Sequence, residues 1–551
     1  MTSFNPSKYQ PFKPIPLTVR RWPDRTIERA PDWCAVDLRD GNQALVRPMT
    51  LEKKLRLFRV LVDIGVKEIE VGFPAASQPD FDFVRRIIDE RLVPADVRLQ
   101  VLTQSRANLI ARTFEAVRGA KSVNVHLYNS TSTVQREHVF GLDRPGIVDI
   151  AVRGATWIEE GARQHPETDF EFEYSPESFT NTELDFAAEI VNAVVAVWRP
   201  HCGRRVVINL PATVEVSTPN VYADMIEWMN DHIDHRRSLR LSVHTHNDRG
   251  SGVAAAELGV MAGADRVEGT LLGNGERTGN MDLVTMAMNL YSQGVDPKLD
   301  LSRMKEIVAA VEECTEIATH PRHPYAGELV FTAFSGSHQD AIRKCLARRS
   351  DGDPWNVPYL PIDPHDLGRH YEEVVRLNSQ SGKGGVLHVL ERDFGITLPR
   401  WLQIEFAKVV QAEAERTGGE IDGKRVRQLF ERAYVTVADD ARVVGYDLVR
   451  DGERVRAEVT FADGARRSGK GGGAVEALID GWERAHGLSV TVEAFDEMAL
   501  GVGTGASAMA CVRVRSNDVA RVGVALAPDT TAASLQAVST AVAQLESSRS
   551  G

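Results

Sequence analysis

Two histidines near the end of an apolar segment offer the clearest chemistry in this sequence. The segment Leu241–Val243 leads into His244-Thr245-His246, and a polar loop follows at Asn247–Gly250. Side chains two residues apart on a β-strand project from one face, so we expect His244 and His246 to point in the same direction. Two converging imidazoles suit a divalent metal. The simpler alternative is a pair of histidines that are only hydrogen-bonded at a strand end.

A third candidate ligand lies far upstream, at the end of another apolar segment. Trp33–Leu38 reads as a buried strand and runs directly into Arg39-Asp40. The carboxyl ends of parallel strands lie on one face of a sheet, so Asp40, His244 and His246 could share one metal and leave coordination positions open for a substrate. An ordinary surface pair of Arg39 and Asp40 is the alternative interpretation.

The elements that must position these side chains alternate regularly between strand and helix. Capping residues mark helix starts, as at Thr50 and at Thr218-Pro219. Eight strand–helix units between Trp33 and Gln293 predict a closed (β/α)₈ barrel, a TIM barrel of the α/β class. An open doubly wound sheet is the runner-up, and it is disfavoured because polar residues follow nearly every strand. The predicted strands are 33–38, 67–71, 98–102, 122–127, 169–174, 205–210, 239–244 and 266–270, and the predicted helices are 50–64, 80–91, 106–117, 146–163, 182–197, 219–234, 251–262 and 281–292.

In a (β/α)₈ barrel the active site lies at the carboxyl ends of the strands. The sequence places at those ends a candidate metal set, an arginine, further acid or base groups and a glycine-rich loop, Gly273–Asn280. All of these groups are expected on one face of the barrel, and this favours a catalytic site. Glu70 and Glu268 can also be read as structural ion-pair partners. The polar residues at the strand ends are Arg39, Asp40, Gln43, Glu70, Thr103, Arg106, His126, Glu173, Ser175, Glu177, Asn209, Thr213, His244, His246 and Glu268.

Three further regions flank the predicted barrel, which we assign to residues 31–300. Residues 1–30 contain five prolines and are expected to form an extended arm. Residues 301–431 are predicted to form a small, mainly helical subdomain, in which Asn378–Gly385 is either an anion-binding loop or a glycine-rich linker. Residues 432–551 are predicted to form an α+β regulatory domain of two similar units, each with strands before a helix. Its strands are expected at 435–437, 455–461, 488–492 and 508–514, and its helices at 473–485 and 531–546.

Composition excludes several classes of function. A net charge of -12 and a pI of about 5.8 argue against a nucleic-acid-binding protein. No apolar run approaches the roughly 20 residues of a membrane span, and the N-terminus shows no secretory signal. The five cysteines form no Cys-x-x-Cys pair, which predicts free thiols and a cytoplasmic location.

Two signature motifs connect the chain to a family. Leu38–Gln43, with Lys54 after the gap Ala44–Lys53, resembles the first signature of the alpha-isopropylmalate and homocitrate synthase family. Leu241–Ala254, with its core His-x-His-Asn-Asp-x-Gly, resembles the second. The chain is most similar to long members of the family, up to about residue 430 and more loosely in a leucine-sensing C-terminal domain, where Ala525–Ser534 matches best. The other similar motifs are Lys8–Phe12, Phe172–Glu177, Asn209–Glu215, Gly273–Asn280, Phe334–Asp340, Val357–Pro364 and Asn378–Gly385.

The resemblance implies a reaction and a role for each site residue. Acetyl-CoA would condense with 2-oxoisovalerate (3-methyl-2-oxobutanoate) to give 2-isopropylmalate and CoA, the first committed step of leucine biosynthesis. Arg39 would stabilise the alkoxide, while Glu177 and His338 are the candidates for the base, with Tyr359 assisting. The residues implied for metal binding are Asp40, His244, His246 and Asn280, and those implied for substrate binding are Gln43, His126, Ser175 and Thr213.

The resemblance also implies cofactors and partners. The metal would be Mg²⁺, with Mn²⁺ or Zn²⁺ as alternatives, and K⁺ would activate the enzyme. Leucine would act as an allosteric inhibitor through the last domain. A homodimer would allow His338 to reach the barrel of a partner chain. Neither nucleic acid nor a membrane is expected as a partner.

Four other functions stay open on the sequence alone. A homocitrate or citramalate synthase would share the metal set and differ in the oxo-acid pocket. A metal-dependent lyase or aldolase would not need the C-terminal domain. A leucine-binding protein without activity is disfavoured by the intact site residues. A non-haem iron oxygenase also uses two histidines and one carboxylate, but the strand-end placement in a barrel disfavours it.

Overall fold

The computed structural model describes residues 5–9, 12, 14–350, 352–371, 390, 395–417, 421, 423–500 and 507–548. The chain divides into two units. The first comprises Met1–Phe331 with Ile362–Tyr371, and the second comprises Thr332–Pro361 with Glu372–Gly551. The stretch Asn378–Gly385, predicted to be an anion-binding loop or a linker, lies outside the described residues.

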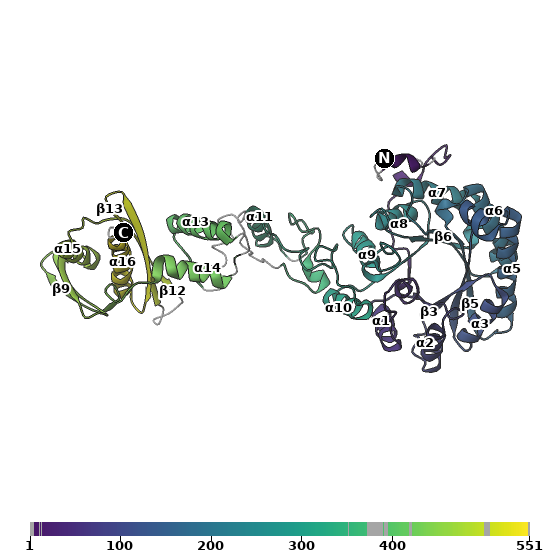
Figure 1. Cartoon of the computed structure of the whole chain (residues 1–551), viewed down its shortest axis with the longest axis horizontal. Helices are drawn as coiled ribbons and strands as arrows, with labels where there is room; N and C mark the ends of the chain where they lie inside the picture. The colour runs from purple at the N-terminus through teal and green to yellow at the C-terminus, as the bar shows by residue number, and fades with distance from the viewer. Residues whose placement is uncertain are drawn as a thin grey trace. The chain divides into compact units, whose positions relative to one another are not determined.

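Eight parallel strands form a closed barrel in the first unit, which confirms the predicted (β/α)₈ fold (Figure 1). β1 pairs with both β2 and β8, and this last pairing closes the sheet. Each predicted strand corresponds to an observed one. The strands are β1 (Asp32–Ala35), β2 (Glu68–Gly72), β3 (Arg98–Gln104), β4 (Ser122–Ser130), β5 (Asp169–Glu177), β6 (Val206–Ala212), β7 (Arg240–Thr245) and β8 (Arg266–Gly269).

Helices alternate with the strands and surround the barrel (Figure 1). Thr50 caps the first of them, because its Oγ1 accepts a hydrogen bond from the Lys53 backbone N–H at 3.4 Å. Thr218 makes no such side-chain bond, and the helix after it begins with Pro219 instead. The helices are α1 (Leu51–Asp63), α2 (Gln78–Asp89), α3 (Ala107–Val117), the short α4 (Thr133–Gln135), α5 (Arg144–Arg163), α6 (Leu184–Trp198), α7 (Pro219–His232), α8 (Gly252–Met261) and α9 (Leu283–Tyr291).

A layer of charged and amide side chains is buried inside the barrel. Arg266 on β8 is fully buried, and its Nε lies 2.7 Å from Glu68 Oε2 on β2. Its Nη1 lies 3.0 Å from Glu268 Oε1, and its Nη2 donates to Gln100 Oε1 on β3 at 2.5 Å. Glu173 on β5 joins this layer at 3.3 Å from the same guanidinium. Buried charges are tolerated when they are paired, so this layer is a rigid support for side chains further along the strands.

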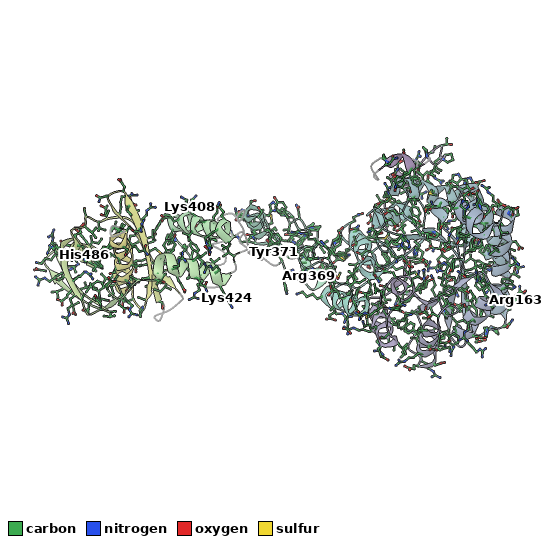
Figure 2. The ribbon with its side chains drawn as sticks, in the orientation of Figure 1. Arg163, Arg369, Tyr371, Lys408, Lys424 and His486 are labelled. Carbon is green, nitrogen blue, oxygen red and sulfur yellow. The ribbon has the colours of Figure 1, made fainter. Side chains whose placement is uncertain are left out.

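The first unit continues beyond the barrel. The helix α10 (Met304–Thr315) packs against α1. The segment 362–371 returns to this unit, and Arg369, labelled in Figure 2, holds it there. Its guanidinium donates to the carbonyl oxygens of Gly327 at 2.7 Å and Glu328 at 3.0 Å.

The second unit begins with helices and ends with two antiparallel three-stranded sheets, each followed by a helix. This confirms the predicted helical region, the α+β domain and its two similar strand–helix units. The strand predicted at 435–437 is wrong, because Glu431–Val435 forms a π-helical turn and Tyr434 packs into a buried cluster. The elements are α11 (Gly336–Leu346), α13 (Arg400–Thr417), α14 (Gly423–Phe430), β9 (Val443–Asp451), β10 (Arg454–Phe461), β11 (Arg466–Gly471), α15 (Ala474–His486), β12 (Thr491–Leu500), β13 (Ser507–Ser516), β14 (Val519–Ala527) and α16 (Thr530–Ser547).

Alternation along β13 explains how the last sheet is covered on both faces. Met509 belongs to the same buried cluster as Phe406 on α13. Its neighbour Ala510 belongs to a different cluster, together with Val538 on α16. Successive strand residues face opposite sides, so a strand buried on both faces reads as a continuous apolar run.

Two further features of the structure are the hydropathy of its described helices and the state of its cysteines. None of the described helices is both long enough and apolar enough to cross a membrane. All five cysteines are free thiols, and Cys34, Cys314 and Cys511 are buried. Burial raises the pKa of the Cys511 thiol to about 12, so this side chain acts as an unreactive core residue.

Candidate active site and metal centre

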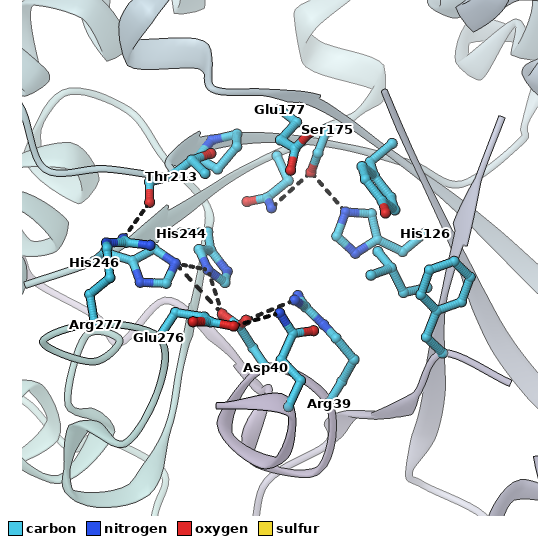
Figure 3. Close-up of a pocket in the computed structure, with 16 residues that line it drawn as sticks. Arg39, Asp40, His126, Ser175, Glu177, Thr213, His244, His246, Glu276 and Arg277 are labelled. Atoms are coloured by element: carbon cyan, nitrogen blue, oxygen red, sulfur yellow. Dashed lines mark hydrogen bonds and ion pairs between the residues drawn. The ribbon is translucent and has the colours of Figure 1, made fainter. Parts of the chain in front are cut away.

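A cavity of about 280 Å³ opens at the carboxyl ends of the barrel strands. Figure 3 shows that Asp40, His244 and His246 lie together along it and that His126 lies beside Ser175. This is the face on which the sequence predicted a site. The predicted residues that line the cavity are Arg39, Asp40, Gln43, His126, Ser175, Glu177, Asn209, Thr213, His244 and His246.

Asp40, His244 and His246 bring three potential ligand atoms together. Asp40 lies in a π-helical turn after β1, and the histidines lie at the end of β7. Asp40 Oδ2 is 3.3 Å from His244 Nε2 and 3.6 Å from His246 Nε2, and the two nitrogens are 3.3 Å apart. All three residues are buried. Two imidazoles and one carboxylate are a typical donor set for a divalent metal that keeps positions free for substrate.

Glu268 determines which nitrogen of His244 faces this set. Glu268 Oε2 lies 2.8 Å from His244 Nδ1. Burial opposes ionisation of Glu268, but Arg266 and His244 hold its pKa well below the usual range, so the carboxylate can only accept hydrogen bonds. His244 Nδ1–H therefore donates to Glu268. The Nε2 lone pair of a neutral His244 is then directed toward Asp40 and His246.

The electrostatics of the three residues favour a bound cation. Burial opposes a charge on Asp40, but Arg39 and the histidines hold the pKa of its carboxyl well below its ordinary value. Burial also opposes a charge on His244, yet Asp40 and Glu268 raise its pKa to about 9. Burial and the charge of His244 lower the pKa of His246 to about 4. The carboxylates thus attract positive charge to His244 Nε2, and a divalent cation meets this demand.

Two buried oxygen atoms support the same conclusion. Asn280 faces His246 across an isolated β-bridge. Its Nδ2 donates to Asn274 O at 3.1 Å, while its Oδ1 is buried and has no hydrogen-bond partner among the residues that the structure describes, as is also true of Asp40 Oδ2. Buried oxygens normally accept hydrogen bonds or coordinate an ion. The residues present therefore fit a divalent metal.

Arg39 connects this set to the barrel interior. Its Nε donates to Glu70 Oε2 at 2.5 Å, and its Nη1 lies 3.0 Å from Asp40 Oδ1. Burial opposes the charge, but Glu70 and Asp40 raise the pKa of the guanidinium above its already high value. Arg39 is therefore a permanent, fixed cation at the cavity, which is the property needed to stabilise an oxyanion.

His126 and Ser175 form a second polar group at the cavity. His126 Nε2 lies 2.7 Å from Ser175 Oγ, and His126 Nδ1 lies 2.9 Å from Glu70 Oε1. Asn209 Nδ2 donates to the same Ser175 Oγ at 3.1 Å. Burial opposes a charge on His126, but Glu173 and Glu70 outweigh it and raise the pKa of the imidazole.

Three other predicted residues line the same cavity. Ser130 Oγ donates to Glu177 Oε2. Thr213 Oγ1 accepts a hydrogen bond from a backbone N–H at 2.9 Å. Gln43 Nε2 donates to Glu276 Oε1 at 3.3 Å. The cavity thus combines one carboxylate, one hydroxyl and one amide with the charged groups described above.

His338 and Tyr359 lie in the second unit rather than in the barrel unit. Their rings stack, with centroids 3.8 Å apart and planes inclined by 21°. Tyr359 is exposed, and its φ of 66° places it in the left-handed region. The roles expected of these two residues therefore stay predictions.

Three parts of the chain match known protein families. Residues 30–311 match the HMGL-like family, residues 328–391 match the alpha-isopropylmalate synthase post-catalytic domain-like family, and residues 420–546 match the LeuA allosteric (dimerisation) domain. The 2-isopropylmalate synthase of Alcanivorax borkumensis is 61% identical over 548 residues, which are 99% of this chain and 98% of that protein. The chain belongs to the 2-isopropylmalate synthase family. The relative from Rhodospirillum rubrum is 53% identical over 96% of this chain and 97% of its own length.

This membership confirms the relationship predicted from the two signatures, and it makes the chain an enzyme of the acyltransferase class. Among solved structures, a hydroxymethylglutaryl-CoA lyase from Pseudomonas aeruginosa is 18% identical, with a TM-score of 0.44. The match covers 53% of this chain and 95% of the lyase.

Some residues that line the cavity were not predicted. Most of these residues are largely apolar, and an apolar side chain carries no pattern that marks it as part of a site. The strand period would have placed two of them, since Leu102 is two residues beyond Gln100 and Tyr128 is two beyond His126. The lining residues missed as individual sites are Phe73, Leu102, Tyr128, Pro211, Glu276 and Arg277.

Replacing Glu268 with glutamine is expected to weaken metal binding by about 10- to 100-fold. The amide is a weaker acceptor for His244 Nδ1–H and no longer fixes the tautomer that presents Nε2. Titration with Mn²⁺, followed by electron paramagnetic resonance, measures the change. Glu257→Gln on the outer helix α8 is the matched control, and equal affinity in the two variants would contradict the positioning role of Glu268.

Proposed function

We propose that this chain condenses acetyl-CoA with 2-oxoisovalerate and hydrolyses the thioester, releasing 2-isopropylmalate and CoA. The observation that carries the proposal is the presence, in one cavity, of a divalent-metal donor set beside the fixed cation Arg39. The curated relatives that cover nearly the whole chain bear the name of this activity. The reaction would be the first committed step of leucine biosynthesis.

A divalent cation held by Asp40, His244 and His246 would supply Lewis-acid polarisation of the oxo-acid carbonyl. We propose Mg²⁺, with Mn²⁺ or Zn²⁺ as alternatives, because a mixed set of imidazole and carboxylate donors accepts all three. Activation by K⁺ stays part of the proposal. Arg39 lies beside Asp40 and is held there by Glu70, which supports a role for its guanidinium in stabilising the alkoxide formed when the acetyl carbon attacks.

Removal of a proton from the acetyl methyl group requires a base at the cavity. Glu177 lines the cavity and is held by the Ser130 hydroxyl, so it is the barrel residue that we propose for this step. His338 is the second candidate, with Tyr359 stacked on it. We propose that a homodimer brings the His338 of one chain to the barrel of the other.

The cavity wall supports a branched, uncharged side chain on the oxo acid. Phe73, Leu102 and Pro211 provide apolar surface. The two arginines that line the cavity, Arg39 and Arg277, each already pair with a carboxylate. The second carboxylate of 2-oxoglutarate would therefore compete with existing ion pairs, and pyruvate would leave the apolar surface uncovered. These contacts favour 2-oxoisovalerate over the substrates of homocitrate and citramalate synthases.

Product analysis tests the proposed reaction. Purified protein with Mg²⁺, acetyl-CoA and 2-oxoisovalerate should form 2-isopropylmalate, identified by nuclear magnetic resonance, together with an equal amount of CoA thiol. A product that retained the thioester would contradict the hydrolytic step. Product from pyruvate or 2-oxoglutarate alone would reassign the chain to the citramalate or homocitrate synthases.

We further propose that the C-terminal domain mediates dimerisation and inhibition by leucine. Residues 420–546 match an allosteric dimerisation domain, and they form the two strand–helix units of the second unit. A cytoplasmic location completes the proposal and is supported by the free thiols.

Deleting residues 434–551 is expected to abolish inhibition by leucine, because the deletion removes both strand–helix units. Activity assays with and without leucine measure the effect. Helices α13 and α14 share a buried cluster with β13, so a second truncation from residue 400 controls for exposure of that cluster. Leucine inhibition that persisted in either truncated enzyme would refute the assignment of this domain.

A further inference from the structure

The glycine-rich loop Gly273–Asn280 follows β8 and ends beside the candidate metal set. Its last residue, Asn280, faces His246 across an isolated β-bridge, and Asn280 Oδ1 has no hydrogen-bond partner among the described residues. Arg277 lies earlier in the loop and lines the cavity, where Figure 3 shows it joined to Thr213. No step of the proposed reaction uses this arginine.

Arg277 connects this loop to the loops that follow β6 and β7. Its Nε donates to Asp248 Oδ1 at 2.6 Å, and its Nη2 donates to Asp248 Oδ2 at 3.1 Å, so the ion pair is bidentate. The same Nη2 donates to the Thr213 carbonyl oxygen at 2.6 Å. Asp248 lies two residues after His246, and its Oδ2 also accepts from the Glu215 backbone N–H at 2.9 Å. One guanidinium therefore joins three neighbouring loops.

The backbone of the glycine-rich loop is tightly folded around these contacts. Arg277 has a φ of 56°, in the left-handed region that a residue other than glycine adopts only at a cost in free energy. A Cβ at Gly275 would collide with Asn280 Nδ2, and a Cβ at Gly279 would collide with the Gly273 carbonyl oxygen. Because such a conformation needs external support, the hydrogen bonds of the guanidinium stabilise the loop up to Asn280.

The position of this loop also determines how the end of β7 and Asn280 meet. Asn247, the residue after His246, donates from its backbone N–H to Gly279 O at 3.0 Å. Gly279 in turn precedes Asn280, so the two β-bridged residues are also linked through their neighbours. A displaced loop would therefore change the distance between His246 and Asn280 Oδ1. Contacts outside a metal site act in this way, because they orient the side chains that bind the metal.

We propose that the ion pair between Arg277 and Asp248 positions the metal site by fastening the glycine-rich loop to the loops that follow β6 and β7. The inference rests on the metal set in the proposed function and adds two positioning residues to it. Arg277 acts through the loop that carries Asn280, and Asp248 acts through the segment that carries His246.

Positioning and simple electrostatics predict opposite effects for Arg277. The guanidinium lines the same cavity as His244 and His246, so its positive charge repels a divalent cation bound by them. Loss of that charge alone would strengthen metal binding, whereas loss of the fastening would weaken it. Asp248 cannot make this distinction, because loss of its negative charge weakens cation binding in either case. Arg277→Gln is therefore the diagnostic variant.

The experiment is a Mn²⁺ titration of the full-length protein without substrates, followed by electron paramagnetic resonance. Arg277→Gln should raise the Kd by about 10-fold, the lower end of the effect of residues that orient metal ligands. Arg236→Gln is the matched control and should bind Mn²⁺ as the wild type does. Arg236 Nη2 also joins a carboxylate to a carbonyl oxygen, Asp265 Oδ2 and Gly263 O, both at 2.7 Å, but it lies before β7 at the opposite end of the barrel.

Two further measurements separate positioning from a general loss of structure or of substrate binding. In a double-mutant cycle, Arg277→Gln combined with Asp248→Asn should have a Kd within about twofold of Asp248→Asn alone, because either substitution already breaks the pair. In the assay of CoA release, Arg277→Gln should need about 10-fold more Mg²⁺ for half-maximal activity. At saturating Mg²⁺ its kcat should recover to within about threefold of the wild type, because mass action refills the site.

Three results would overturn the positioning role. Equal or tighter Mn²⁺ binding by Arg277→Gln would mean that the guanidinium acts only through its charge. Kd changes that multiplied in the double variant would mean that the two residues act separately. A KM for either substrate that stayed raised at saturating Mg²⁺ would mean that Arg277 contacts the substrate. If the wild type itself bound no Mn²⁺, the proposed metal set would fail, whereas wild-type binding with an unaffected Arg277→Gln would remove the positioning role alone.

Discussion

The His246→Ala variant is expected to lose activity by about 10³-fold, which corresponds to about 4 kcal/mol of transition-state stabilisation. His246 Nε2 is one of three ligand atoms that converge with Asp40 Oδ2 and His244 Nε2. Its other ring nitrogen has no hydrogen-bond partner among the described residues, so the substitution breaks few contacts and should leave the barrel folded.

Two measurements test whether His246 acts as a metal ligand. Mn²⁺ titration reports binding directly, and CoA release at saturating metal reports turnover. His232→Ala, at the exposed end of α7, is the matched control and should behave as the wild type. Unchanged turnover of His246→Ala at saturating metal would remove this residue from the proposed metal set.

The Arg39→Lys variant is expected to lower kcat by about 10²- to 10³-fold, the cost of removing one oxyanion-stabilising donor. The guanidinium contacts Glu70 through Nε and Asp40 through Nη1. A lysine ammonium keeps the charge, but its single nitrogen cannot hold both contacts and also face the alkoxide. The loss should therefore appear in kcat and leave the KM for acetyl-CoA within a few-fold.

Arg106→Lys is the matched control for this substitution. Arg106 follows β3 at the same end of the barrel, but it is exposed and does not line the cavity. Steady-state kinetics of both variants measure the difference. Equal rates for Arg39→Lys and the wild type would show that the alkoxide is stabilised by other groups.

The barrel was predictable because its eight strands are short, largely apolar segments that alternate with helices, several of which begin at a capping side chain. The C-terminal strands were harder to predict, and β11 shows why. Its sequence, Arg466–Gly471, reads as a glycine-rich loop. In the structure, a Cβ at Gly469 or Gly471 would clash with the backbone of α15 at Ala477, and Gly523 on β14 has the same relation to α16. The glycines therefore permit close helix–sheet packing, which no local pattern reveals.

The candidate site was predictable where spacing along one strand decides which side chains meet. His244 and His246 share a face because they are two residues apart. The side chains that hold these two histidines in position come from more than one strand. Glu268 could be read from the sequence as an ion-pair partner or as a site residue, and in the structure it pairs with Arg266 and also orients His244. Such a double role follows from the pairing of β7 with β8, which places His244 directly opposite Glu268.

The most direct test of the proposed function is the rate of CoA release from acetyl-CoA with purified protein and Mg²⁺, compared among 2-oxoisovalerate, pyruvate and 2-oxoglutarate. We predict that release is fastest with 2-oxoisovalerate and that it stops when a chelator removes the metal. Faster release with another oxo acid would contradict the proposed substrate. No release with any of the three would contradict the condensation itself.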